Sequence, residues 1–124
     1  MSNIEIIKEV TDAFLQNRYD LEILDKYFTP DFERTANGQR SDLKGYAAHL
    51  KDYMRDYISL STPEWDELFA ADDKVVCAYT FEGKRKDGTQ ERLAVIAIWR
   101  IRDGKIVALR EVGALQPPST GSTP

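Results

Sequence analysis

Glu111 is the residue whose side-chain type and sequence surroundings best fit a role in catalysis. It is the one acid in an apolar run, KIVALREVG at 105–113. A carboxylate held among apolar side chains is poorly solvated, so it can exchange protons near neutral pH as a general acid or base. The alternatives are a structural ion pair with an arginine, or simple exposure to solvent in the other strand register.

His49 and Arg34 are the next polar candidates. His49 is the single histidine, which excludes relays and metal sites built from several imidazoles. It flanks an apolar helical stripe, with Tyr46 three residues before it and Tyr53 four residues after it. His49 therefore contacts a ligand or is a partly exposed structural residue. Arg34 binds a ligand carboxylate, pairs with an acid or is a solvated surface residue.

Several aromatic side chains could line a pocket for a flat or ringed ligand, because aromatic walls with a few polar groups are typical of small-molecule sites. They are Tyr46, Tyr53, Trp65, Tyr79 and Trp99. For each of them, ordinary core packing is the alternative. The expected partner is thus a small apolar or aromatic molecule.

Motifs for cofactors are missing from the chain. It contains no Walker loop, GxGxxG, CxxC or HExxH pattern, so we expect no nucleotide, metal or other cofactor. The net charge is −4 and no basic stripe is present, which argues against nucleic acid as a partner.

The cellular setting follows from the same composition. No apolar run approaches the roughly 20 residues that span a bilayer, and the first ten residues do not resemble a signal peptide. Cys77 is the only cysteine, which suits a reducing compartment. We expect a cytoplasmic protein that does not bind membranes.

The first half of the chain shows helical spacing of apolar residues. Ser2 and Glu5 form a capping-box pattern ahead of the first helix. The predicted helices cover 3–17, a short stretch from Asp20 that Pro30 stops, and a long stretch from Ser41 or Asp42 to about Ile58. The segment 32–39 is ambiguous, with a turn at 37–38 that a short strand can precede.

The second half shows strand patterns joined by short turns. The predicted strands cover 64–70, 75–84, 91–102 and 105–114. Such short connections join antiparallel neighbours, so the four strands form a meander. Three helices followed by this meander predict an α+β fold with helices on one face of an antiparallel sheet. The chain is expected to be one domain over 1–115 with a flexible Pro/Ser/Thr-rich tail over 116–124.

The strand at 91–102 is apolar on both of its faces. An antiparallel sheet with one wet face should alternate apolar and polar residues, whereas here the run LAVIAIWRI does not alternate cleanly. Since the helices can cover only one face, we expect the other face to form a homodimer. Solvation of that face by long side chains is the alternative.

The Asp103-Gly104 turn decides which way Glu111 faces. A two-residue loop pairs 102 with 105 and puts Glu111 beside Ile96 and Ile98. A three-residue loop pairs 101 with 105 and places Glu111 opposite Val95, on the face of Ala97 and Trp99. We favour the three-residue loop, because small and large neighbours around the acid can leave a cavity.

Residues 3–113 resemble the nuclear transport factor 2-like superfamily, and within it the SnoaL-like group. The resemblance is carried by the order of elements, by YFTPDF at 27–32 and by WRIRDGKIVALREVG at 99–113. It implies a cone-shaped, cystatin-like α+β barrel, in which a curved sheet wraps the helices around an apolar pocket, and dimers formed through the sheets.

The resemblance also implies a role for Glu111. SnoaL-like cyclases use an acid on the final strand as general acid/base, and Glu111 matches that position. Their histidine after the second helix is replaced here by Arg34-Thr35. Ketosteroid isomerases use acids near Thr35 and Ala97, and neither acid is present. The expected function is an acid/base enzyme of cyclase, isomerase or dehydratase type, or a ligand-binding or interaction module without catalysis.

Overall fold

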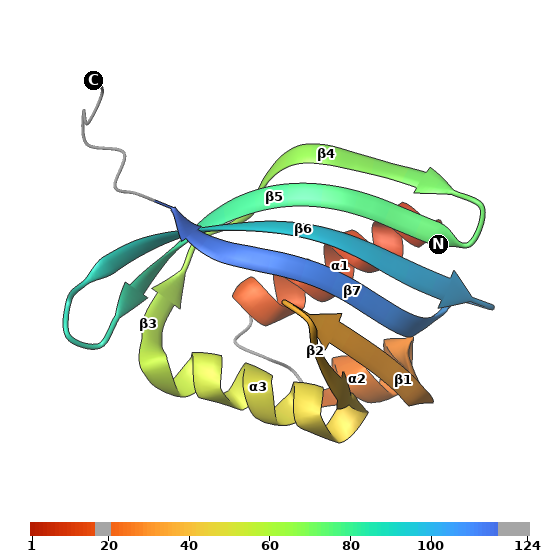
Figure 1. Cartoon of the computed structure of the whole chain (residues 1–124), viewed down its shortest axis with the longest axis horizontal. Helices are drawn as coiled ribbons and strands as arrows, with labels where there is room; N and C mark the ends of the chain where they lie inside the picture. The colour runs from red at the N-terminus through yellow and green to blue at the C-terminus, as the bar shows by residue number, and fades with distance from the viewer. Residues whose placement is uncertain (17–20, 117–124) are drawn as a thin grey trace.

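Three helices and seven strands make up the computed structural model, which describes residues 1–16 and 21–116. In chain order the elements are α1 (Asn3–Leu15), α2 (Leu21–Tyr27), β1 (Phe28–Ala36), β2 (Gln39–Asp42), α3 (Leu43–Asp56), β3 (Tyr57–Leu60), β4 (Glu64–Ala71), β5 (Lys74–Arg85), β6 (Gln90–Arg102) and β7 (Lys105–Gln116). The helices lie together on one side of the curved sheet (Figure 1). The predicted α+β class is confirmed.

The helices begin at the residues whose side chains cap them. Ser2 and Glu5 form the predicted capping box of α1. Asp42 caps α3 by accepting a hydrogen bond from the amide of Gly45 at 2.8 Å. The cap predicted at Asp20 lies outside the described residues.

The helix ends differ from the prediction. The first helix stops at residue 15 rather than 17, and α3 stops at residue 56 rather than 58. Pro30 does not stop α2, which has already ended at Tyr27; Pro30 instead lies inside β1, where the pairing with β7 is irregular. Proline has no backbone N–H and cannot donate a hydrogen bond to a neighbouring strand, so an interruption of the regular pairing accommodates it.

The sheet is mixed and open, in the order β2-β1-β7-β6-β5-β3, with β4 also paired to β5. The predicted meander is present as β4 to β7, and every pairing within it is antiparallel. The pairing of β1 with β7 is parallel, so the sheet is not purely antiparallel. This pairing brings the segment after α2 beside the strand that carries Glu111.

The hydrophobic core fills the end of the molecule near the β4–β5 and β6–β7 turns. It contains fully buried side chains from the helix α1 and from three strands: Ile7, Val10, Phe32, Val75 and Ile106. The ring of Phe32 packs edge-on against that of Phe28 at 4.9 Å between centroids. Burial of these apolar side chains is the main stabilising term of the fold.

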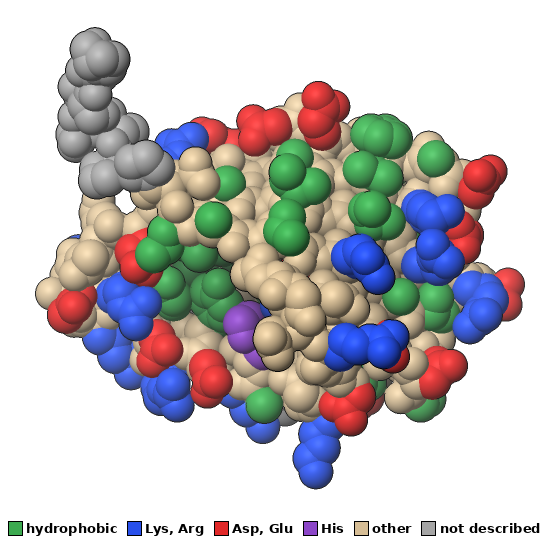
Figure 2. All heavy atoms as spheres, in the orientation of Figure 1, with side chains coloured by type: hydrophobic (Ala, Val, Ile, Leu, Met, Phe, Trp, Pro, Cys, Tyr) green, Lys and Arg blue, Asp and Glu red, His purple; other side chains and the backbone are tan. Residues whose placement is uncertain are grey.

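The outer face of the sheet exposes large apolar side chains. Ile96 is 58% exposed, Val112 54% and Ile98 38%. Figure 2 shows hydrophobic side chains gathered over the strands on this face. In the part of the chain that the structure describes, no helix is long and apolar enough to cross a membrane.

Candidate functional site

A cavity of about 300 Å³ lies between the concave face of the sheet and the helices α1 and α3. Its walls are mainly apolar and aromatic, and the only charged side chains among its described lining residues are Arg34 and Glu111. Figure 2 shows a hollow lined by hydrophobic side chains next to the only histidine. The volume is at the lower end of the range for small-molecule sites, about 300–1,000 Å³.

The β6–β7 turn has two residues, not the three that we favoured. Asp103 and Gly104 both have positive φ, 53° and 76°, and Arg102 pairs with Lys105. This is the geometry of the two-residue turns that match strand twist. The prediction that Ile101 pairs with Lys105 is therefore wrong.

A β-bulge restores the predicted facing of Glu111. One extra residue of β7, Val107, shifts the pairing by one position after the turn. Glu111 consequently pairs with Ala97, whereas an uninterrupted two-residue hairpin would have set it opposite Ile96 and the favoured register set it opposite Val95. Because a shift of one residue reverses the facing of a whole strand, the bulge turns the carboxylate to the concave side.

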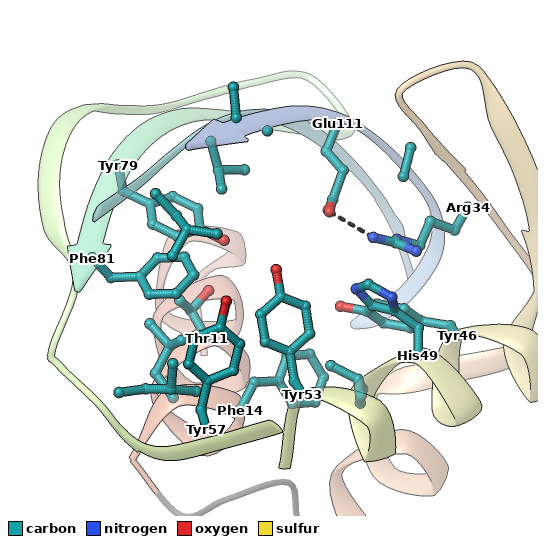
Figure 3. A pocket seen from close by; sticks show the side chains of 18 of the residues that line it. Thr11, Phe14, Arg34, Tyr46, His49, Tyr53, Tyr57, Tyr79, Phe81 and Glu111 are labelled. Atoms are coloured by element: carbon teal, nitrogen blue, oxygen red, sulfur yellow. Dashed lines mark hydrogen bonds and ion pairs between the residues drawn. The ribbon is translucent and has the colours of Figure 1, made fainter. Parts of the chain in front are cut away.

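Arg34 pairs with Glu111 inside the cavity wall. Its Nη2 donates to Glu111 Oε1 at 2.9 Å, and the two side chains are 10% and 18% exposed. The parallel β1–β7 register places them close, because Ala36 is the partner of Glu111. Figure 3 shows both side chains reaching from the sheet toward one another. The predicted alternative of an ion pair with an arginine is thus present, and the pair borders the cavity.

The guanidinium of Arg34 uses only part of its donor capacity. It lies over the ring of Tyr46, with Cζ 5.0 Å from the centroid. The bond to Glu111 is its one hydrogen bond to a described residue, and its Nε is buried without a partner. Buried N–H groups in proteins normally find an acceptor. An oxygen atom of a bound molecule would be a suitable one.

His49 is kept neutral at the cavity edge. Burial lowers the pKa of His49, and the nearby charge of Arg34 lowers it further, while Asp52 opposes the shift. The imidazole packs edge-on against the ring of Tyr53 at 5.0 Å. At neutral pH the imidazole can therefore donate or accept a hydrogen bond without adding a second positive charge beside Arg34.

Three tyrosines keep their protons and present hydroxyl groups as donors. Burial raises the pKa of Tyr46 and of Tyr79 well above the ordinary value, and the charge of Glu111 adds to the shift. The same two causes raise the pKa of Tyr53. In Figure 3 the hydroxyl of Tyr53 points into the cavity, toward the side of Glu111.

The two tryptophans occupy different places. Trp99 lines the cavity, and its indole Nε1 is buried without a hydrogen-bond partner among the described residues. Trp65 is not a lining residue; it packs against the ring of Tyr79 at 5.0 Å. The structure therefore brings five of the six predicted ligand-contacting residues to the cavity, namely Arg34, His49, Tyr53, Tyr79 and Trp99.

Asn37 supports the strand that carries Glu111, a role that the sequence analysis missed. Its side-chain amide donates to the carbonyl of Gly113 at 3.3 Å and accepts from the Gly113 amide at 3.0 Å. Its backbone amide donates to the carbonyl of Glu111 at 3.0 Å. The Asn-Gly pair signalled only a turn. The hydrogen bonds between Asn37 and Gly113 form because β1 lies beside β7, and no local sequence pattern indicates that pairing.

The chemistry available in the cavity is proton transfer and hydrogen-bond donation. A carboxylate, a guanidinium with N–H donors not bonded to described residues, and several phenol hydroxyls face a mainly apolar space. Among residues 1–16 and 21–116, no group of three His, Cys, Asp or Glu side chains is placed to hold a metal ion.

The open mixed sheet wrapped around helices and a cavity defines an α+β cone of the nuclear transport factor 2-like kind. The SnoaL-like domain family matches residues 7–109, and the chain belongs to this family. The predicted superfamily and group are confirmed.

Solved structures show the same fold at low sequence identity. AclR from Streptomyces galilaeus, a candidate hydroxylase, superposes with a TM-score of 0.78 at 19% identity, over 91% of this chain and 79% of that one. IdmH from Streptomyces antibioticus, a candidate polyketide cyclase, superposes with a TM-score of 0.77 at 17% identity, over 90% and 92%. An uncharacterised protein of Schizosaccharomyces pombe is 24% identical over 106 residues, which is 86% of this chain and 81% of that protein.

Proposed function

We propose that this protein binds a small ring-containing carbonyl compound in the cavity and catalyses a proton transfer on it, with Glu111 as general acid/base. The observation that carries the proposal is the Glu111 carboxylate, which borders a mainly apolar cavity and accepts one hydrogen bond from the described residues, that of Arg34. A positioned carboxylate in such a site can move a proton to or from a substrate carbon. The polyketide cyclase candidate among the structural neighbours supports this class of chemistry.

The residues divide the reaction between them. Glu111 takes a proton from the carbon next to the carbonyl, and the electron pair of that C–H bond moves onto the carbonyl oxygen. A remaining N–H donor of Arg34 and the hydroxyl of Tyr53 stabilise the oxygen as it becomes negative. Return of the proton to another carbon completes an isomerisation. Attack of the enolate carbon on a second carbonyl of the same molecule closes a ring, and the proton held by Glu111 passes to the alkoxide oxygen that this attack forms.

The aromatic walls serve binding and exclude water. Rings from α3 and β5 line the cavity, including Tyr53, Tyr79 and Phe81. Flat molecules gain from offset or edge-on contacts with such rings as well as from loss of apolar surface to water. A dry site also strengthens each hydrogen bond that acts on the reacting oxygen.

A ligand-binding protein without catalysis is the second candidate. The observation that favours it is the same Arg34–Glu111 pair, because two buried opposite charges satisfy one another. In that case Glu111 would be a fixed part of the wall and ligand binding would involve no proton transfer.

Deuterium exchange separates the two functions. The native protein is incubated in D₂O with a panel of cyclic ketones and hydroxyquinones, and thermal stabilisation and deuterium uptake at carbon are measured together. We expect stabilising ligands to gain deuterium with the native protein and not with Glu111→Gln. Glu67→Gln is the matched control, since Glu67 is exposed on β4 and is not a lining residue. Thermal stabilisation without deuterium uptake favours the binding protein. If no compound in the panel gives either stabilisation or deuterium uptake, both proposed functions are refuted.

We also propose that two copies associate through the outer face of the sheet in the cytoplasm. Ile96, Ile98 and Val112 form a contiguous set on β6 and β7, and each is at least 38% exposed. An exposed apolar set of this kind favours a protein contact. The free, buried Cys77 suits the reducing compartment.

A further inference from the structure

The cavity has two different ends. The ion pair of Arg34 and Glu111 lies at one end, and Tyr57 and Phe81 lie at the other, which Figure 3 shows on opposite sides of the space. A ligand that fills the cavity with its reacting carbon at Glu111 extends toward Tyr57. The residues at this second end therefore determine how long the ligand can be.

Tyr57 occupies space that a glycine leaves open. Along β5, alternate residues face the cavity side, so Tyr79, Phe81 and Gly83 form one row. A Cβ atom at Gly83 would lie 2.8 Å from two ring carbons of Tyr57 and 3.1 Å from Leu60. Gly83 does not have a positive φ. Glycine is therefore needed at position 83 because it lacks a side chain, and not because of its backbone conformation.

Tyr57 is also held by two residues that do not line the cavity. Its hydroxyl donates to Glu91 Oε1 at 2.5 Å, and Arg85 lies over its ring, with Cζ 5.1 Å from the centroid. Arg85 and Glu91 form an ion pair at 3.2 Å. Burial and the carboxylate of Glu91 raise the pKa of Tyr57 to about 12, so the hydroxyl remains a donor. These contacts fix the ring in one orientation.

The fixed ring supports a second ring that faces the ligand space. Tyr57 and Tyr53 stack with centroids 5.4 Å apart and planes 16° apart. In Figure 3 the two rings stand side by side. A change at Tyr57 or at Gly83 is thus transmitted to the wall of the cavity by direct contact.

We infer that Tyr57 is a specificity-determining residue that limits the length of the ligand, and that Gly83 is the positioning residue that lets its ring lie in place. This inference rests on the proposed function, since it concerns the ligand of the same cavity. Removing the ring lengthens the space measured from Glu111. Adding a methyl group at Gly83 pushes the ring of Tyr57 away from β5 and shortens that space.

Hydroxyquinones with two, three and four fused rings test the inference as probes of increasing length. Dissociation constants are measured by calorimetry for the native chain, Tyr57→Ala, Gly83→Ala and the double variant. We expect Tyr57→Ala to shift the preference toward the four-ring probe by about tenfold, and Gly83→Ala to shift it by a similar factor toward the two-ring probe. The double variant should behave like Tyr57→Ala, because no ring remains for the new methyl group to displace.

Two further variants control for misfolding and for loss of the Tyr57 hydroxyl. Tyr57→Leu repeats the test if the alanine variant does not fold, and Tyr57→Phe keeps the ring and should keep the native order of preference. An unchanged order of preference in Tyr57→Ala or Tyr57→Leu overturns the inference and leaves the proposed function standing. Failure of the native chain to bind any of the probes refutes the proposed function together with this inference.

Discussion

Replacing Arg34 by methionine removes the positive charge from the cavity wall while keeping a side chain of similar length. Glu111 would then hold a negative charge at a site where its side chain is 18% exposed and where the other described lining residues are uncharged. Loss of one partner from a buried ion pair typically destabilises a protein by about 3–5 kcal/mol. Because the pair borders the cavity and keeps some contact with solvent, we expect a loss of about 2–3 kcal/mol in the free energy of unfolding.

The assay is urea denaturation at pH 7 and one protein concentration, which keeps any effect of association constant. Arg40→Met is the matched control on the neighbouring strand. Arg40 also bonds a glutamate, Glu33, at 2.7 Å, but these side chains are 74% and 55% exposed. Exposed pairs contribute at most about 1 kcal/mol, so the control should lose little stability.

The double variant Arg34→Met/Glu111→Leu completes the test. It removes both charges, and apolar replacement of a buried pair is often neutral or stabilising, so we expect stability within about 1 kcal/mol of the native chain. The reasoning is refuted if Arg34→Met costs no more than Arg40→Met. It is equally refuted if the double variant is as unstable as the single one.

Three other predictions follow from the structure. Asn37→Ala removes two side-chain bonds to Gly113 and should cost about 1–2 kcal/mol, with faster hydrogen exchange at the Gly113 amide as its specific signature; unchanged exchange there would contradict it. Ile96→Lys should convert a dimer to a monomer in analytical ultracentrifugation while the chain stays folded, and a native chain that sediments as a monomer would rule the dimer out. The single imidazole should titrate by NMR below the ordinary 6.5 of the unfolded chain, so His49 lowers stability as the pH falls through that range; a midpoint above 6.5 would contradict the burial of His49.

The meander could be predicted from sequence because each of its signals is local. Alternating apolar residues and short turns fix where β4 to β7 begin and end, to within about two residues. The same is true of the caps of α1 and α3. By contrast, β1 contains Pro30 and a mixed pattern, and it exists because it pairs with a strand more than seventy residues away. No window of the sequence contains that information.

The facing of Glu111 was predicted correctly on a wrong premise. The turn has two residues, and the bulge at Val107 supplies the shift that a longer loop would have supplied. A bulge has little local signature, because it is selected by packing on both faces of the strand. Likewise, the sequence offered Arg34 and Glu111 as separate candidates, and only the parallel pairing of β1 with β7 shows that they are one ion pair.

The molecule has a filled end and a hollow end. Ile7, Val10 and Ile106, packed at the filled end, are completely inaccessible. Tyr53 and Val95, at the hollow end, retain partial exposure. Since the cost of a substitution depends on how much packing it removes, residues around the cavity can change at lower cost than those at the filled end. Evolution can therefore remodel the ligand space of this chain while the filled end continues to maintain the fold.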